Sequence, residues 1–372
     1  MSRPASTVET PSDSIVPSVQ SVVCSYTEWD PLEEVVVGTL DGATIPSWDV
    51  ALKATMPHPA WPTFHQRGGR PFPADWIEPA RRELEEFVHI LEAEGVTVRR
   101  PEPYDHTRAF ATQDWFSAGG LYSAMPRDAF LVVGNDIIEA PMAWRSRYFE
   151  ANAYKSLLKE YFAGGARWTA VPKPELSDAL FNLDFEEPTT AHPPSFVITE
   201  FEPTFDAADF ARCGRDIFAQ RSNVTNLFGI EWLRRHLGPE YRVHLLEVDD
   251  PHPMHVDATF VPLAPGKLLI NPERVSKIPD VLRHWDVLVA PEPVERSPER
   301  FSMCTEWISM NVFSLDEKRV FVEKTEEPLV RQLKDWGFEP ILCSLKNFNI
   351  FGGGFHCCTL DIRRRGALRS YT

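Results

Sequence analysis

The sequence lacks long apolar runs, clustered cysteines and an excess of positive charge. No apolar segment approaches the roughly 18 residues that a membrane-spanning helix needs. The six cysteines are scattered without a C-x-x-C pair, so a disulfide framework is not expected and a reducing compartment is favoured. With 38 Lys and Arg against 54 Asp and Glu, the net charge of −16 argues against nucleic acid and anionic membranes as partners.

The N-terminal residues have the composition of a tail. The first twenty are rich in Ser, Thr and Pro, without the apolar core of a signal peptide or the Arg-rich character of a transit peptide. We therefore interpret residues 1–24 as a disordered tail and expect a cytoplasmic protein. The chain is 43% hydrophobic and no low-complexity linker divides it, so residues 25–372 are predicted to form a single domain.

One pattern recurs along this predicted domain: two strands joined by a short turn, then a helix, then another strand. In the second copy, Cys213–Asp216 marks the turn and Gly238 ends the helix. Near the N-terminus, Asp75 and Glu78 have the spacing of a capping box. The predicted hairpins span residues 129–142, 205–222, 257–272 and 308–324, and a further unit begins at residue 33.

Units of this kind cannot bury their own faces, which favours a repeat architecture that closes on itself. We expect an α/β fold in the form of a ring of about five blades. The alternative is an ordinary open α/β sheet, which the hairpins disfavour because they make the sheet mixed rather than parallel.

Five polar stretches stand at the same edge of their units, so a ring would bring them to a central cavity. An Asp before a hairpin is more often a turn or cap residue than a catalyst, which leaves each single one ambiguous. The five stretches are Tyr122–Asp128, Glu202–Asp209, Met254–Asp257, Ser302–Glu306 and Gly352–Cys358.

Cys357 is the candidate nucleophile. It follows three glycines, which supply positive φ or close backbone approach, and a cysteine after such a turn is well placed to react. Cys358 is predicted to be a buried small hydrophobe on the opposite face. His255 could instead form a satisfied core pair with Asp257, or His252, His255 and Asp257 could bind a metal.

Long motifs give the chain a family resemblance: TEWDPLEEV, GLYSAMPRD, EAPMAWRSR, FDAADF, GRDIFAQRS, HPMHVDATF, LDEKRV and GGGFHC. From about Ser25 to the C-terminus the chain resembles the glycine amidinotransferase family of the guanidine-modifying superfamily. The resemblance implies a pentein-type propeller with five ββαβ-like blades around a central active site. It also implies transfer of the amidino group of L-arginine through a covalent amidino-cysteine to an amine, with ping-pong kinetics, no metal or organic cofactor, and a homodimer.

The resemblance also implies roles for individual residues. Cys357 is expected to be the nucleophile, His255 the general acid and base, and Asp206 the carboxylate that orients it. Asp128 and Asp257 are expected to hold the guanidinium. The remaining substrate-binding positions are Arg274 for the α-carboxylate, together with Tyr122, Met254, Cys304 and Thr305.

The acceptor amine is the open part of the interpretation. Glycine, giving guanidinoacetate and ornithine, is the first choice, and lysine, a diamine or an aminocyclitol are alternatives. Cys304-Thr305 and His252 depart from the two serines and the asparagine of the family, which weakens the case for glycine. An arginine-deiminase-like hydrolase and an inactive binding protein with the same ring fold are the rival functions.

Overall fold

The computed structural model describes residues 21–189, 195–294 and 301–372. Residues 1–20, which make up most of the predicted tail, lie outside the described residues. Residues that precede the predicted boundary at residue 24 already pack on the folded ring. Val23 is buried, the Val22 N–H donates to the Gly164 carbonyl at 3.3 Å, and the Cys24 N–H donates to the Ile362 carbonyl at 3.0 Å.

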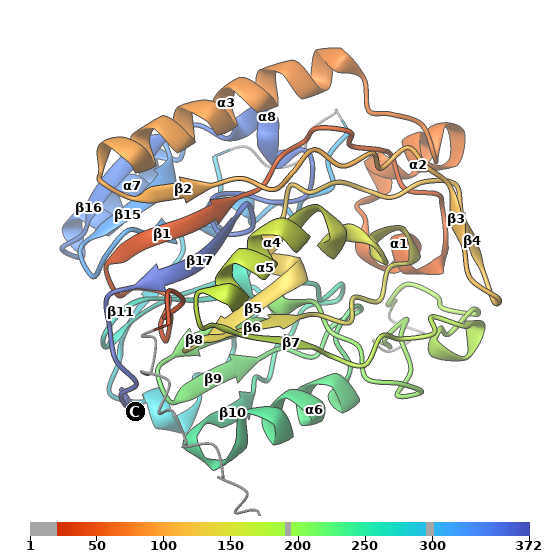
Figure 1. The fold of residues 1–372 in the computed structure, drawn as a ribbon. Coiled ribbons are helices and arrows are strands. Elements are labelled where there is room, and N and C mark those ends of the chain that lie inside the picture. The colour runs from red at the N-terminus through yellow and green to blue at the C-terminus, as the bar shows by residue number, and fades with distance from the viewer. Residues whose placement is uncertain (1–20, 190–194, 295–300) are drawn as a thin grey trace, which may run out of the picture.

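The described residues form five three-stranded sheets arranged around a centre (Figure 1), together with a two-stranded sheet of β3 (Phe110–Ala111) and β4 (Phe116–Ser117). In each three-stranded sheet an antiparallel pair is followed by a third strand that runs parallel to its neighbour. The blades are β17–β1–β2 (Thr359–Arg364, Leu32–Val37, Thr97–Arg99), β5–β6–β7 (Phe130–Val133, Asp136–Glu139, Arg167–Ala170), β8–β9–β10 (Phe210–Cys213, Asp216–Ala219, Arg242–Leu245), β11–β12–β13 (Phe260–Ala264, Lys267–Ile270, Asp286–Val289) and β14–β15–β16 (Phe313–Ser314, Arg319–Glu323, Glu339–Cys343).

The ring prediction is confirmed and the open-sheet alternative is wrong. The two ends of the chain close the ring, because β17 pairs antiparallel with β1, with Val37 opposite Thr359 and Val35 opposite Asp361. The first blade therefore completes only when the last strand of the chain is in place. The sequence pattern predicted the start of this blade but did not predict its C-terminal partner strand.

Helices connect the second and third strands of most blades. These are α3 (Ala74–Ala93), α5 (Lys155–Ala163), α6 (Leu227–Leu237) and α7 (Glu327–Asp335). The β11–β13 blade has only the short 3₁₀ helix η8 (Asp280–Leu282) there. The β1–β2 connection also holds the short helices α1 (Val50–Thr55) and α2 (Trp61–Arg67). The short helix α8 (Lys346–Asn349) lies between β16 and β17, beside α3 (Figure 1).

The helix ends test the local predictions. In α6, the Asn226 side chain accepts from the Gly229 N–H, and Gly238 ends the helix with φ of 69°, as predicted. The capping box at Asp75 is wrong, since α3 begins at Ala74 after Pro73 and has no side-chain cap. Asp75 lies inside the first turn, where its charge still complements the helix dipole.

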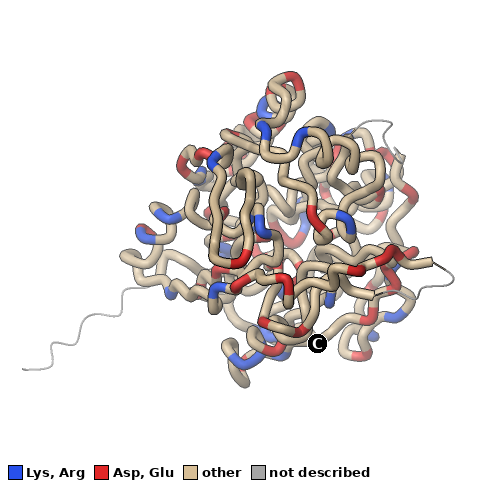
Figure 2. Tube along the Cα trace, turned by 90° about the vertical axis from the view of Figure 1, so that its right-hand side faces the viewer, with Lys and Arg blue, Asp and Glu red and all other residues tan. Residues whose placement is uncertain are grey.

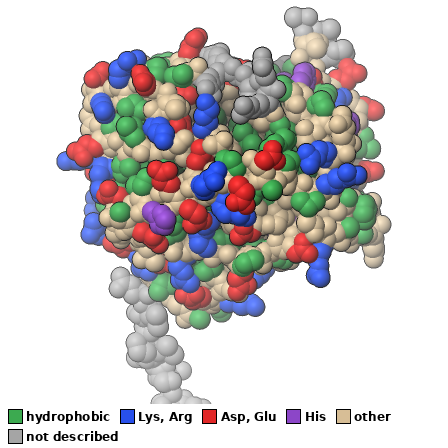
Figure 3. Space-filling model, turned by 90° about the horizontal axis from the view of Figure 1, so that it is seen from above, with side chains coloured by type: hydrophobic (Ala, Val, Ile, Leu, Met, Phe, Trp, Pro, Cys, Tyr) green, Lys and Arg blue, Asp and Glu red, His purple; other side chains and the backbone are tan. Residues whose placement is uncertain are grey.

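Charge is spread over the surface rather than collected in one area. Acidic and basic residues are scattered over the trace in Figure 2, and the face in Figure 3 mixes both signs with apolar side chains. Within the described residues, no helix combines the length and the apolar composition required to span a bilayer.

A network of buried ion pairs connects blades of the ring. Arg212 of β8 grips both carboxylate oxygens of Glu28 through Nε and Nη2, at 2.8 and 2.7 Å, and its Nη2 also donates to Asp361 of β17 at 2.6 Å. Arg364 donates from Nε to the same Asp361 oxygen at 2.6 Å. All four side chains are buried, so the β8–β9–β10 blade and the β17–β1–β2 blade share one set of charges.

Replacing Arg212 tests this network. Arg212→Met leaves Glu28 and Asp361 buried with less compensation, so we expect a loss of about 3–5 kcal/mol in the free energy of unfolding, measured by denaturant titration. Arg81→Met is the matched control, because Arg81 pairs with Asp41 and Glu78 at the surface, and it is expected to cost less than about 1 kcal/mol. Equal costs for the two variants would contradict the assigned role of the network.

Candidate active site

The candidate site lies where the first strand of each blade begins. Short segments precede these strands, and the segments contact one another around the ring: α4 (Pro126–Ala129), η5 (Ala207–Asp209), η7 (Val256–Ala258), η9 (Ile308–Met310) and the turn before β17. All of these segments except η5 contribute residues to the lining of a cavity of about 1520 Å³. Nine of the ten sequence-predicted site residues line it: Tyr122, Asp128, Met254, His255, Asp257, Arg274, Cys304, Thr305 and Cys357.

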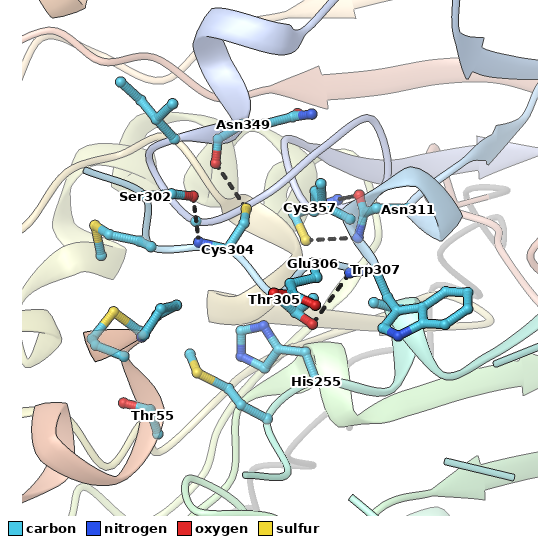
Figure 4. Close-up of a pocket in the computed structure, with 18 of the residues that line it drawn as sticks. Thr55, His255, Ser302, Cys304, Thr305, Glu306, Trp307, Asn311, Asn349 and Cys357 are labelled. Atoms are coloured by element: carbon cyan, nitrogen blue, oxygen red, sulfur yellow. Dashed lines mark hydrogen bonds between the residues drawn. The ribbon is translucent and has the colours of Figure 1, made fainter. Parts of the chain in front are cut away.

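Cys357 lies at the floor of the cavity with its sulfur between two polar groups. Its Sγ donates to Asp257 Oδ2 at 3.0 Å. The same Sγ accepts from Asn311 Nδ2 at 3.0 Å (Figure 4). Burial and the nearby Asp257 and Asp128 carboxylates raise the pKa of the Cys357 thiol well above its usual range. The thiol therefore needs a positive charge beside it to ionise near neutral pH.

The glycine run before Cys357 behaves as predicted. Gly352 has φ of 102°, and a Cβ on Gly353 would lie 2.5 Å from the Cys357 Cβ and 2.7 Å from the Met125 sulfur. A side chain is thus excluded by conformation at one glycine and by space at the next. Cys358 is fully buried in the apolar core, as predicted.

His255 carries a positive charge in this environment. Its Nε2 lies 3.0 Å from Asp206 Oδ2 and its Nδ1 3.6 Å from Asp128 Oδ1. Burial works to lower the pKa of His255, but the Asp128 charge and the hydrogen-bonded Asp206 outweigh it and raise the pKa to about 10. The backbone of His255 has φ of 60°, a strained conformation for a residue other than glycine, and the fold holds it there.

Arg147 holds the two carboxylates that face His255. Its Nη1 donates to Asp128 Oδ2 at 2.8 Å and lies 3.5 Å from Asp206 Oδ2, while Nε and Nη2 pair with Glu150 at 2.7 and 2.6 Å. Asp128 Oδ1 and Asp206 Oδ1 are buried without a hydrogen-bond partner. Unpaired buried acceptors are costly. Asp128 lines the cavity and Asp206 does not, so the Asp128 oxygen is the one that indicates room for a ligand's donor.

Asp257 belongs to a second chain of hydrogen bonds. His356 lies between two carboxylates, with Nδ1 at 3.0 Å from Asp257 Oδ2 and Nε2 at 3.3 Å from Glu28 Oε2. Burial raises the pKa of Asp257, but the hydrogen bond and charge of His356 outweigh it and hold that pKa below its ordinary value. Asp257 is therefore an anion that faces the thiol.

The remaining predicted residues lie along the cavity wall. Arg274 donates from Nη2 to the Thr305 hydroxyl at 2.6 Å and pairs through Nε with Asp250 at 3.0 Å. The Cys304 thiol donates to the Asn349 carbonyl, so it is turned toward backbone. Tyr122 is buried, with the Arg147 guanidinium 5.7 Å from its ring centroid.

The metal site considered from the sequence is not assembled. Within the described ranges, one group of three or more His, Cys, Asp or Glu side chains has ligand-type atoms that all lie within 4.8 Å, namely Asp128, His255 and Cys357. His252 and Asp257 are not members of it. The group combines a thiol, an imidazole and a carboxylate, which is also the set of side chains that covalent catalysis by cysteine uses.

Three residues with direct roles in the geometry were not singled out from the sequence. Arg147 and His356 stood inside quoted motifs, and Asn311 stood at the start of a predicted hairpin, but none had a local signal of its own. Each acts through partners distant in sequence, which single-chain patterns do not reveal.

The charge on His255 predicts a pH-dependent stability. Its pKa of about 10 in the folded chain exceeds the value of about 6.5 expected after unfolding, so its stabilising contribution is complete below about 6.5 and is lost as pH rises through 10. We expect the difference in unfolding free energy between the wild type and His255→Asn to shrink across this window. A difference that stays constant would contradict the charged state.

No family model matches the chain. The chain is 58% identical over 351 residues to an L-arginine:L-lysine amidinotransferase of Pseudomonas savastanoi pv. phaseolicola, covering 94% of this chain and 97% of the relative. It is 49% identical over 357 residues to the mitochondrial glycine amidinotransferase of Danio rerio, covering 94% and 84%.

Solved structures agree with these relatives. An amidinotransferase of the saxitoxin biosynthetic pathway from Microseira wollei superposes with a TM-score of 0.88 at 54% identity, covering 94% of this chain and all of that one. A dimethylarginine dimethylaminohydrolase, at 15% identity and a TM-score of 0.57 over 88% of this chain and 99% of that one, shares the pentein fold alone. The chain therefore belongs to the amidinotransferase family and has its pentein fold.

Proposed function

We propose that the protein moves the amidino group of L-arginine to an amine through a covalent adduct on Cys357. The observation that carries the proposal is the convergence of the Cys357 thiol, the His255 imidazole and the Asp128 carboxylate within 4.8 Å at the cavity floor. Asp128 and Asp257 are the carboxylates available to grip the planar cation from its N–H edges. The bound cation also favours loss of the thiol proton to solvent, which the acidic neighbours otherwise oppose.

In the first half-reaction the thiolate attacks the central guanidinium carbon and forms the C–S bond. His255, charged at neutral pH, gives its proton to the departing nitrogen as the C–N bond breaks, so ornithine leaves and an amidino-thioether cation stays on Cys357. In the second half-reaction the neutral His255 takes one proton from the attacking amine. The new C–N bond forms, the C–S bond breaks and the thiolate returns.

We propose lysine as the first acceptor to test, ahead of the glycine that the sequence favoured. An arginine whose guanidinium lies at Cys357 must extend to the side chains that bind its α-carboxylate. Our candidates for these side chains are Arg274 and Thr305. Lysine is longer than the departing ornithine by one methylene, so it can reuse that partner. Glycine carries its carboxylate two bonds from its nitrogen and cannot span the same two points.

The relative that acts on lysine supports this order. The glycine amidinotransferases keep glycine as the second candidate, and both acceptors would use the same floor of the cavity. The homodimer and the cytoplasmic location stay predictions.

Cysteine variants test the nucleophile. Cys357→Ala is expected to abolish ornithine release and the mass shift of the adduct, because the Cys304 thiol, which also lines the cavity, is turned toward the Asn349 carbonyl. Cys358→Ala is the matched control and is expected to keep most activity, since its sulfur faces the Phe355 carbonyl in the core. Full activity of Cys357→Ala would assign the role of nucleophile to another residue. Loss of activity in a folded Cys358→Ala protein alone would have the same consequence.

An acceptor panel tests the proposed specificity. We expect lysine to clear the adduct about ten- to a hundredfold faster than glycine, since a charged hydrogen bond to Arg274 contributes about 1.5–3 kcal/mol. Arg274→Gln is expected to remove most of that preference. Faster clearance by glycine in the wild type would restore the first choice from sequence, and citrulline without any amine would identify a hydrolase.

A further inference from the structure

Asn311 connects the nucleophile turn to the neighbouring blade. It follows η9, and its Oδ1 accepts three backbone N–H groups, from Gly354 at 3.2 Å, His356 at 3.0 Å and Cys357 at 3.2 Å. A side-chain amide accepts only through its oxygen, so three donors at one atom fix which end of the amide is which.

The other end of the same amide faces the reactive sulfur. Asn311 Nδ2 lies 3.0 Å from Cys357 Sγ, and Figure 4 shows the two side chains directed toward each other. Asn311 is only 2% exposed, so this donor is largely shielded from bulk water. A fixed N–H donor stabilises a thiolate more than a neutral thiol, because the acceptor is charged.

We propose that Asn311 is a catalytic residue that stabilises the Cys357 thiolate through Nδ2–H. The inference rests on the proposed amidino transfer, in which the sulfur is an anion twice: when it attacks the guanidinium and when the acceptor amine expels it. The amide proton stays on nitrogen throughout, and only the C–S and C–N bonds of the two half-reactions form and break.

The donor matters because the surroundings of the sulfur are largely acidic. Asp257 accepts from the thiol directly, and Asp128 adds a second nearby carboxylate, so ionisation works against both. Asn311 counters them without adding charge that would repel the cationic substrate. The titratable groups around the sulfur are Asp257 and His255 with η7, Asp128 of α4, Tyr122 and the adjacent His356.

Asn311→Asp separates the two functions of the amide. The carboxylate keeps an oxygen for the three backbone donors but replaces the donor to sulfur with an acceptor. In the full chain without substrate, we expect the thiol pKa to rise by one unit or more, so that alkylation of Cys357 by iodoacetamide at neutral pH slows about tenfold or more. With arginine and lysine, kcat is expected to fall while the KM for arginine stays within about twofold.

Two further variants keep the test interpretable. Asn226→Asp makes the same change at another buried amide, whose Oδ1 accepts from the Gly229 N–H, and its Cys357 alkylation profile is expected to match the wild type. Asn311→Ala removes donor and acceptor together, so it is expected to slow alkylation and also to lower the unfolding temperature.

The outcomes distinguish this inference from the proposed function. A folded Asn311→Asp protein with the wild-type alkylation profile and kcat would overturn the role of Asn311. If Asn311→Asp does not fold, Asn311→Ala provides the test, and alkylation of Cys357 at the wild-type rate in that variant would also overturn the role of Asn311. A wild-type protein whose Cys357 reacts with iodoacetamide but that releases no ornithine would refute the proposed transfer. The comparison of alkylation rates between the wild type and the Asn311 variants would still decide the effect of Asn311 on the thiol.

Discussion

The site depends on carboxylates held away from water around one charged imidazole. His255 keeps its proton because Asp128 and Asp206 face it, and both carboxylates are held by the same Arg147. Asp128, Asp206 and His255 come from three different blades. Their convergence therefore requires the ring, and the ring requires the pairing of β1 with β17 at opposite ends of the chain.

The charge at the cavity floor explains how a protein of net charge −16 selects its substrate. Arg147 is largely neutralised by Glu150, and His356 by its position between Asp257 and Glu28. Asp128 still carries a buried oxygen without a hydrogen-bond partner, and Asp257 lines the same cavity, so the floor favours a planar cation with several N–H donors. Under the proposed function, the same cation favours ionisation of the Cys357 thiol, so substrate binding and formation of the nucleophile are coupled.

Local sequence signals predicted much of this arrangement. Turns such as Cys213–Asp216 marked the hairpins, and Asp206, His255 and Cys357 stood just before first strands, where a ring would gather them. Long-range partners had no such signal. The pairing of β17 with β1, the grip of Arg147 on two carboxylates and the amide of Asn311 under the nucleophile turn all depend on contacts between distant segments.

Other differences arise from local competition. Asp75 and Glu78 fit a capping box by spacing, but Pro73 directly precedes a helix that already begins at Ala74. The recurring pattern places a helix between the second and third strands of each unit, but between β12 and β13 the chain forms only η8, a three-residue 3₁₀ helix with Pro279 before it. In both places proline decides where helical backbone begins, and the wider pattern of the blade is unaffected.

The most direct test of the account is isotope exchange with no acceptor present. The enzyme is incubated with unlabelled L-arginine and labelled ornithine, and label in arginine is measured. A covalent amidino-cysteine predicts that label enters arginine at a rate comparable to turnover, because ornithine reverses the first half-reaction on Cys357. Absence of exchange in an enzyme that turns over once lysine or glycine is added would contradict the covalent intermediate on which the proposed function rests.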